Sequence, residues 1–265
     1  RYVKTVSYSQ FLKERVGLAE DTIQITNAWL LILGGYTGWN YSVREACAMG
    51  APGFRSMGWI GRSLSKGSLV LTKYFLQKTR MFPDGNASVA RLLVQKMIPQ
   101  VAPGMKGVDD VVAARFSYAA LDLDKQPTRI RLNSTAVGVH QNDSDKVEVD
   151  YVQSGNALRI NADHCVLACY NGIIPHLCAQ MPDEQKDALK YGVKTPFVYA
   201  NVLLSNGRAF SKLGATMYQC PHDSFQWVSC APPIAVGGYQ PPRSPDDPML
   251  MFMMSSPVEK PREGM

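Results

Sequence analysis

The chain has 265 residues and a formal net charge of +6, with 46% hydrophobic and 19% charged residues. This balance is typical of a folded globular protein and excludes a disordered chain, while the length suits one large core or two interleaved domains. Lys and Arg are scattered without a basic run, which argues against a nucleic-acid surface. No uninterrupted apolar stretch approaches the roughly 18 residues of a membrane-spanning helix.

The first eighty residues are predicted to be mainly helical. Residues 8–16 have amphipathic spacing and end at a glycine, and residues 22–33 are apolar and end at a Gly-Gly pair. The sequence GGYTG at residues 34–38 follows. Its glycine order differs from the G-x-G-x-x-G of a dinucleotide-binding loop, so we expect a helix end or a packed turn there.

Residues 82–99 contain the most informative local signal, a turn followed by a helix. Pro, Asp, Gly and Asn at residues 83–86 are turn residues, and apolar side chains recur at helical spacing up to Met97 before Pro99. A glycine turn at a helix N-terminus lets a ligand approach free backbone N–H groups. The alternative is an ordinary loop–helix junction. A further short helix is predicted at residues 108–116.

Beyond residue 128 the period changes from helix to strand. Alternating residues predict three antiparallel strands near residues 129–140, 146–151 and 158–160, joined by polar turns, with one face exposed to solvent. Residues 165–169, CVLAC, form a continuous apolar run that predicts a strand buried on both faces of a parallel sheet. Tyr170 would then lie just past the carboxyl end of that strand, where ligands bind in open α/β sheets.

The last third of the chain predicts further strands, at residues 195–204, 217–220, 225–230 and 249–254. The final one is rich in Met, which suits either an adaptable core or an apolar substrate wall.

Six cysteines are present and none belongs to a C-x-x-C pair, so the sequence predicts neither a zinc site nor a thioredoxin-like site. Cys165 and Cys169 are expected to be buried, reduced thiols because they lie in an apolar run. The four histidines have no metal-ligand spacing, and no Ser–His–Asp or Cys–His set stands out. The sequence therefore predicts no metal site and leaves the catalytic residues unknown.

Three segments resemble the bacterial spermidine dehydrogenase-like FAD oxidoreductases, which have the flavin amine-oxidase type of fold. They are FPDGNASVARLLV at residues 82–94, VLACYNGIIP at residues 166–175 and VGGY at residues 236–239. The first two are long and specific, whereas the third is weak alone. The family's initial strand–G-x-G-x-x-G–helix has no counterpart here, and the chain starts without Met, so we expect an internal fragment of a longer protein.

The resemblance implies a fold class of α/β (mixed α+β), as part of a two-domain FAD-binding flavoprotein that lacks the N-terminal Rossmann motif. Residues 1–80 would be the mainly helical part of the substrate domain. Residues 81–178, with the three-stranded meander, would be the central part of the FAD-binding domain. Residues 179–265 would be the second, partly β, segment of the interleaved substrate domain.

The resemblance also implies a set of cofactor-binding residues: Asp84, Gly85, Asn86, Val137, Ala168 and Cys169. Residues 84–86 would lie near the flavin, Val137 would pair through its backbone with the adenine base, and Ala168 and Cys169 would line the cofactor crevice. Plain packing is the alternative for Val137 and Cys169. Candidate contacts for an amine substrate are Tyr170 and Tyr239, with Asp84 and Glu45 as carboxylates that could hold a remote ammonium group.

The implied activity is oxidation of an amine, such as the polyamine spermidine, by hydride transfer to FAD, with an electron acceptor as second partner. The fragment alone is expected to be inactive. Haem occurs in some relatives but has no support in this sequence, and the oligomeric state stays open. The resemblance implies the periplasm, with the cytoplasm as alternative. A flavin oxidoreductase for a non-amine substrate and a non-catalytic binding protein of the same fold remain alternative functions.

Overall fold

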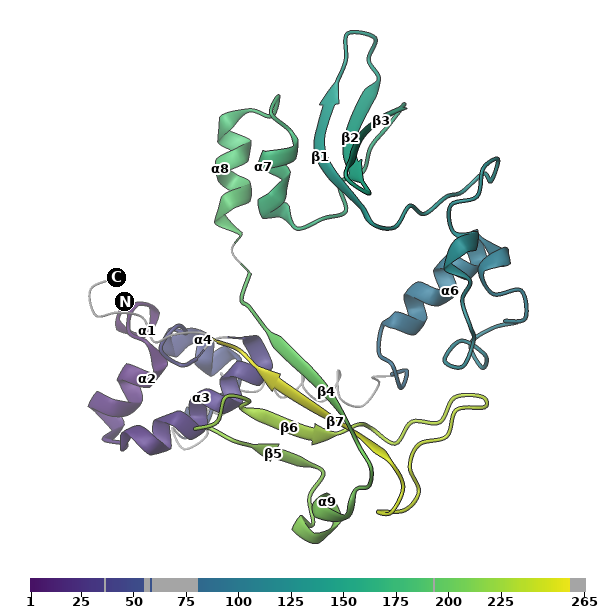
Figure 1. Cartoon of the computed structure of the whole chain (residues 1–265). Helices are drawn as coiled ribbons and strands as arrows, with labels where there is room; N and C mark the ends of the chain where they lie inside the picture. Colours follow the sequence, from purple (N-terminus) through teal and green to yellow (C-terminus); the bar gives the residue numbers. More distant parts are fainter. Residues whose placement is uncertain (36, 55–57, 59–80, 193, 258–265) are drawn as a thin grey trace. The chain divides into compact units, whose positions relative to one another are not determined.

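The computed structural model describes residues 1–35, 37–54, 58, 81–192 and 194–257 (Figure 1). The chain divides into two compact units. The first comprises Arg1–Leu92, Lys106–Ala113 and Thr195–Met265, and the second comprises Leu93–Met105 and Ala114–Lys194. The end of the predicted helical region, residues 59–80, lies outside the described residues.

The first unit begins with a series of helices, as the sequence predicts for this region. They are α1 (Tyr2–Thr5), α2 (Tyr8–Phe11), a π-helical turn (Leu12–Val16), α3 (Glu20–Gly34) and α4 (Val43–Ala48). The π-helical turn ends at Gly17 and α3 ends at Gly35, and both glycines have φ of 77°. Left-handed backbone of this kind is a common helix end that glycine adopts without steric cost.

These helices enclose an apolar core that includes Tyr8, Ile23, Leu30 and Phe54. Tyr8 is fully buried and donates its hydroxyl to the carbonyl oxygen of Pro52 at 2.6 Å. Burial raises the pKa of the Tyr8 phenol to about 12, because the charged form would lose its hydration.

The same unit contains a four-stranded antiparallel sheet in the order β4-β7-β6-β5. Its strands are β4 (Val198–Leu204), β5 (Met217–Gln219), β6 (Trp227–Cys230) and β7 (Met249–Ser255), and α9 (Arg208–Leu213) lies between β4 and β5 in sequence. The strand predictions for this part of the chain are confirmed. Just after β7, the hydroxyl of Ser256 donates to the carbonyl of Gly35 at 2.8 Å, which ties the sheet to the end of α3.

Helix α6 (Ala87–Met97) is confirmed within its predicted bounds, and most of its apolar side chains are exposed. Val89, Leu93 and Met97, four residues apart, are each at least 44% exposed. The fully buried side chain is the polar Ser88. A periodic apolar stripe identifies a helix but does not say which neighbours cover it.

The prediction of a helix at residues 108–116 is wrong, because residues 108–113 are a series of turns. The carboxylate of Asp110 accepts a hydrogen bond from the backbone N–H of Lys106 at 2.9 Å, and the N–H of Val111 bonds the carbonyl of Val108. Side chains of this kind compete with helical backbone bonds, and β-branched Val adds little helix propensity. Two short 3-10 turns, Pro99–Val101 and Tyr118–Ala120, are present in the second unit.

The second unit contains the predicted three-stranded antiparallel meander of β1 (Ser134–Gln141), β2 (Val147–Gln153) and β3 (Asn156–Ala162). The β2–β3 turn has positive φ at both central residues, 50° at Ser154 and 80° at Gly155. This geometry matches the twist of a two-residue hairpin. Strand β1 begins at Ser134, later than the alternation predicted.

The buried parallel strand predicted at residues 165–169 is wrong. The segment belongs to no strand, Val166 is 88% exposed, and Cys165, Ala168 and Cys169 are also exposed. The N–H of Ala168 bonds the carbonyl of Val166, two residues back, which breaks an extended ladder. Among the described residues every strand pair is antiparallel. A continuous apolar run therefore signals burial only where a neighbouring strand is present to pair with it.

Helical segments follow the meander in the second unit. They are a 3-10 turn (Asn171–Ile173), α7 (Ile174–Leu177) and α8 (Asp183–Tyr191). All six cysteines are free thiols, and Cys47 is the buried one. Within the described residues no helix has both the length and the apolar character needed to cross a membrane.

Candidate functional site

The turn that opens α6 is built around a short hydrogen bond between two side chains. The hydroxyl of Ser88 donates to the carboxylate of Asp84 at 2.6 Å, and Arg91 lies 4.0 Å from the same carboxylate. The Asp84 side chain is 31% exposed. It thus holds the start of α6 through one oxygen while its other oxygen faces Arg91, so a structural role accompanies any role in binding.

Gly85 gives this turn its open backbone. Its φ is 67°, and a Cβ placed on it would meet nothing within 4 Å. Its neighbour Asn86 is exposed and accepts from the N–H of Ala90 through its backbone carbonyl. The backbone at Gly85 therefore has open space beside it, and ligand binding at residues 84–86 stays a prediction.

Val137 lies in a β-bulge of strand β1. The pairing register with β2 moves from Ala136 opposite Tyr151 to Gly138 opposite Asp150, so Val137 has no partner residue. Its side chain is 52% exposed, and β1 is an edge strand of the meander. Bulges of this type redirect backbone groups and often lie next to binding sites.

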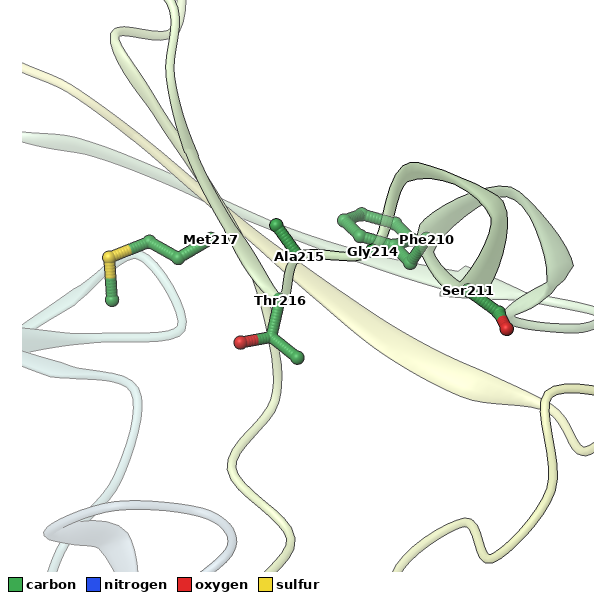
Figure 2. A pocket seen from close by; sticks show the side chains of 6 residues that line it. All are labelled: Phe210, Ser211, Gly214, Ala215, Thr216 and Met217. Carbon is green, nitrogen blue, oxygen red and sulfur yellow. The ribbon is translucent and has the colours of Figure 1, made fainter.

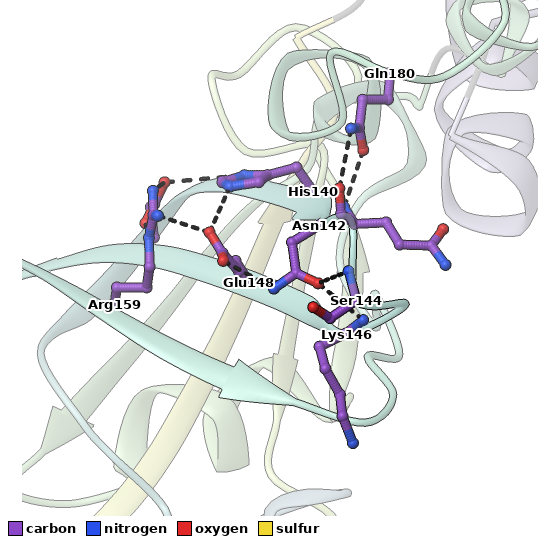
Figure 3. Close-up of polar contacts among 9 residues, drawn as sticks. His140, Asn142, Ser144, Lys146, Glu148, Arg159 and Gln180 are labelled. Atoms are coloured by element: carbon purple, nitrogen blue, oxygen red, sulfur yellow. Dashed lines mark hydrogen bonds and ion pairs between the residues drawn. The ribbon is translucent and has the colours of Figure 1, made fainter.

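A polar cluster of His140, Glu148, Asp150 and Arg159 covers one face of the meander (Figure 3). Arg159 contacts both carboxylates at 2.6 Å, and His140 Nε2 lies 2.9 Å from Glu148. A hydrogen bond from Asn142 is the largest cause that lowers the pKa of Glu148. The bonds from Arg159 lower the pKa of Asp150. Sequence reasoning missed this cluster, although carboxylates at alternate positions of β2 signal a shared face.

The end of strand β1 is bonded by a side chain from beyond α7 (Figure 3). The Gln180 side chain accepts from the backbone N–H of Gln141 at 2.9 Å and donates to the backbone carbonyl of Gln141 at 3.1 Å. It therefore occupies both main-chain groups that a neighbouring strand would use.

A pocket of about 320 Å³ lies in the second unit beside this contact. Its walls come from β1, β2, the segment after β3 and the region from the end of α7 into α8. Cys165 and Cys178 both line it, together with Leu167 and Met181. Cys178 was missed by sequence reasoning, because nothing in its local sequence signals that it lines the same pocket as Cys165.

Ala168 and Cys169, predicted to line a cofactor crevice, are exposed residues beside the pocket-lining Leu167. They belong to the second unit, whereas residues 84–86 belong to the first. A crevice shared by these two groups stays a prediction.

Tyr170 follows directly and is 42% exposed. The ammonium of Lys194 lies 5.6 Å from the centre of its ring, and the Tyr170 hydroxyl is 3.4 Å from the carbonyl of Gly192. The face of this ring therefore already holds an alkylammonium group.

Tyr239 ends the tight turn of residues 236–239. The backbones of Val236 and Tyr239 bond each other in both directions, at 3.2 and 2.9 Å. Gly237 has φ of 53°, and a Cβ there would overlap the carbonyl oxygen of Asp109. The glycine in this motif is thus required by the close approach of two backbones.

Glu45, a candidate carboxylate for a substrate ammonium, is already engaged within its own helix. It forms a capping box at the start of α4, accepting from the backbone N–H and the hydroxyl of Ser42, both at 2.8 Å. We assign it to the scaffold.

A second pocket, of about 480 Å³, lies in the first unit between α9 and β5 (Figure 2). It is lined by Phe210, Ser211, Gly214, Ala215, Thr216 and Met217. Among the described residues no charged side chain lines it, and none of the predicted site residues belongs to it. Among the described residues no group of three His, Cys, Asp or Glu side chains could hold a metal ion.

No protein-family model matches the chain, and no curated protein matches it. A solved structure of putrescine oxidase, a double mutant from a structure-based redesign of its cofactor binding, is similar with a TM-score of 0.48 and 16% sequence identity. The match covers 96% of this chain and 45% of that one, so the chain spans less than half the length of this neighbour.

Proposed function

We propose that this chain is part of an FAD-dependent oxidoreductase that oxidises an amine, with a polyamine such as spermidine as substrate. The proposal rests on the resemblance of residues 82–94, 166–175 and 236–239 to spermidine dehydrogenase-like flavoproteins. The structural observation that carries it is the bulge at Val137, which exposes an unpaired residue on an edge strand.

The bulge fits the adenine end of FAD. Adenine presents a donor and an acceptor on one edge, and the backbone N–H and C=O of a strand residue match that pair. Val137 is unpaired across the ladder, and no described strand lies on the outer side of β1. Val137 would therefore hold the base through its main chain, independently of its side chain.

The turn at residues 84–86 fits a role near the reacting end. Bound FAD would supply the hydride acceptor for the carbon next to the amine nitrogen. The carboxylate of Asp84 would attract a remote ammonium of the substrate, because one of its oxygens remains for a second partner beside Arg91.

Tyr170 and Tyr239 would provide aromatic contacts for the substrate. The ring of Tyr170 already lies against the ammonium of Lys194, which is the kind of contact that a polyamine would make. Both rings are partly exposed, at 42% and 38%.

The periplasm is the compartment we propose for the whole protein.

The test uses the full-length protein. Purified protein should show the visible absorption of bound flavin, and spermidine added without oxygen should bleach it. Val137→Pro, which removes the backbone N–H, should lower flavin content at least ten-fold. Val137→Ala should retain flavin content within two-fold, because the backbone groups remain.

The outcomes separate the alternatives. Full-length protein without flavin would reject the proposal and favour a non-catalytic binding protein. Bound flavin that amines fail to reduce would favour a flavin oxidoreductase for a non-amine substrate. Equal loss of flavin in both Val137 variants, with unchanged circular dichroism, would reject backbone recognition at the bulge.

A further inference from the structure

We propose that Cys165 and Cys178 form a thiol–disulfide site, in which a small disulfide reagent reacts at Cys165 and Cys178 then closes an intramolecular bond. The inference is independent of flavin binding and of amine oxidation. It rests on two thiols that line one pocket and on the irregular backbone of the segment that carries one of them.

The first observation is that the two thiols share one pocket. Cys165 and Cys178 are 13 residues apart in sequence, yet both line the pocket of about 320 Å³ in the second unit. Cys178 immediately follows α7, as its C-cap residue. The fold therefore places a thiol from the loop after β3 and a thiol at the end of a helix on the walls of the same pocket.

The second observation is the difference in accessibility. Cys165 is exposed, whereas Cys178 is partly buried. Burial raises the pKa of the Cys178 thiol, and the negative charge of the Cys165 and Cys169 thiolates raises that pKa further. A reagent therefore meets Cys165 first, because Cys165 is the more exposed thiol and the raised pKa of Cys178 leaves less of that residue in the reactive thiolate form.

The third observation is the backbone around Cys165. The segment of residues 164–169 belongs to no helix or strand. A disulfide requires an S–S length of about 2.05 Å and a Cα separation of roughly 4.4–6.8 Å. Backbone outside a ladder can adjust to that geometry without breaking sheet hydrogen bonds.

The chemistry balances in two exchanges. The Cys165 thiolate attacks one sulfur of a small disulfide, forming a mixed disulfide and releasing one equivalent of the reagent's thiol. The mixed disulfide at Cys165 carries no thiolate charge, so ionisation of Cys178 becomes easier. The Cys178 thiolate then attacks the Cys165 sulfur and releases the second equivalent of thiol. Two protein thiols are oxidised and one reagent disulfide is reduced to two thiols.

The experiment uses 2-hydroxyethyl disulfide, a neutral reagent, on the purified protein under native conditions. Chymotrypsin cleaves after Leu167, Tyr170 and Leu177, so Cys165, Cys169 and Cys178 fall in separate peptides. Mass spectrometry without reduction should find the Cys165 and Cys178 peptides joined. Released 2-mercaptoethanol should reach two equivalents per cross-link.

Variants identify the partners. Cys165→Ser and Cys178→Ser should each lower the cross-linked fraction at least ten-fold, and Cys178→Ser should accumulate the hydroxyethyl adduct on Cys165. Cys169→Ser and the control Cys230→Ser, in the other unit, should leave it within two-fold. Circular dichroism checks that each variant is folded. An adduct on Cys165 of the unmodified sequence without a cross-link, a bond of Cys178 to Cys169 instead, or a cross-link that persists in Cys165→Ser would overturn the inference.

Discussion

The buried hydroxyl of Ser88 donates to the carboxylate of Asp84, in the turn that precedes α6, at 2.6 Å. This bond gives Asp84 a structural role that its position in a sequence motif did not reveal. The structural role of Asp84 can be separated from its proposed attraction of a substrate ammonium by Asp84→Asn, since the amide of Asn retains an acceptor but carries no charge.

We therefore expect Asp84→Ala to lower the free energy of unfolding by about 1–2 kcal/mol, because the Ser88 hydroxyl would lose its partner in a buried position. Asp84→Asn should lower it by less than about 1 kcal/mol. Urea titration measures both, and a double-mutant cycle with Ser88→Ala should give a coupling of about 1 kcal/mol.

In the full-length protein, Asp84→Asn should still lower kcat/KM for a polyamine by at least ten-fold, because the ammonium would lose its counter-charge. Turnover assays at equal folded concentration measure this. Unchanged kcat/KM in Asp84→Asn would place Asp84 in the scaffold alone.

Gly237→Ala should destabilise the first unit by about 3 kcal/mol or more, because a methyl group would collide with the Asp109 backbone and φ is positive. Gly238→Ala is the matched control, since a Cβ there meets nothing within 4 Å, and it should change stability by less than about 0.5 kcal/mol. Thermal and urea unfolding compare the two. Equal stability of both variants would contradict the close approach of the two backbones.

Alkaline pH should destabilise the helical core through Tyr8. Its pKa of about 12 in the folded chain exceeds the ordinary tyrosine pKa of 10.0, so folding favours the neutral phenol. The stabilisation is complete below pH 10 and is lost as pH rises towards 12, on the order of 2 kcal/mol. Tyr8→Phe should flatten this part of the stability curve, whereas Tyr191→Phe, at a side chain 92% exposed, should leave it unchanged.

Acid should destabilise the meander through Glu148 and Asp150, whose pKa values are lowered in the fold. Their contribution is present above the unfolded carboxyl pKa and is lost as pH falls through the lower folded values. Arg159→Gln should reduce this acid sensitivity, because Arg159 contacts both carboxylates. Arg115→Gln, at another exposed residue of the same unit, is the control. Unfolding followed between pH 5 and pH 2 should separate them, and identical curves would show that the cluster contributes nothing.

Local sequence patterns predicted the elements whose hydrogen bonds join residues that are close together in the sequence. The turn at residues 83–86 and helix α6 follow from Pro, Gly and apolar spacing, and the meander follows from alternation with turn residues. The strands β4 and β7 were predicted from extended apolar runs, and each has a partner strand in the sheet of the first unit.

Features that depend on distant neighbours were not predictable in this way. The run at residues 165–169 reads as a buried strand, yet within the described chain no strand pairs with it. Val89, Leu93 and Met97 are exposed, so apolar residues at helical spacing predict a helix without identifying the residues that cover it. That Cys165 and Cys178 line the same pocket depends on how the chain folds back after β3, which residue spacing does not encode.

The two hydrogen bonds between Gln180 and Gln141 have a consequence for the behaviour of the protein at high concentration. An edge strand with unsatisfied main-chain groups is a template on which another molecule can extend the sheet and begin to aggregate. The Gln180 side chain makes the two hydrogen bonds that a neighbouring strand would make at that end of β1, so a second molecule cannot pair with it there. The chain thereby keeps an accessible edge around its bulge while limiting the length over which a foreign strand could attach.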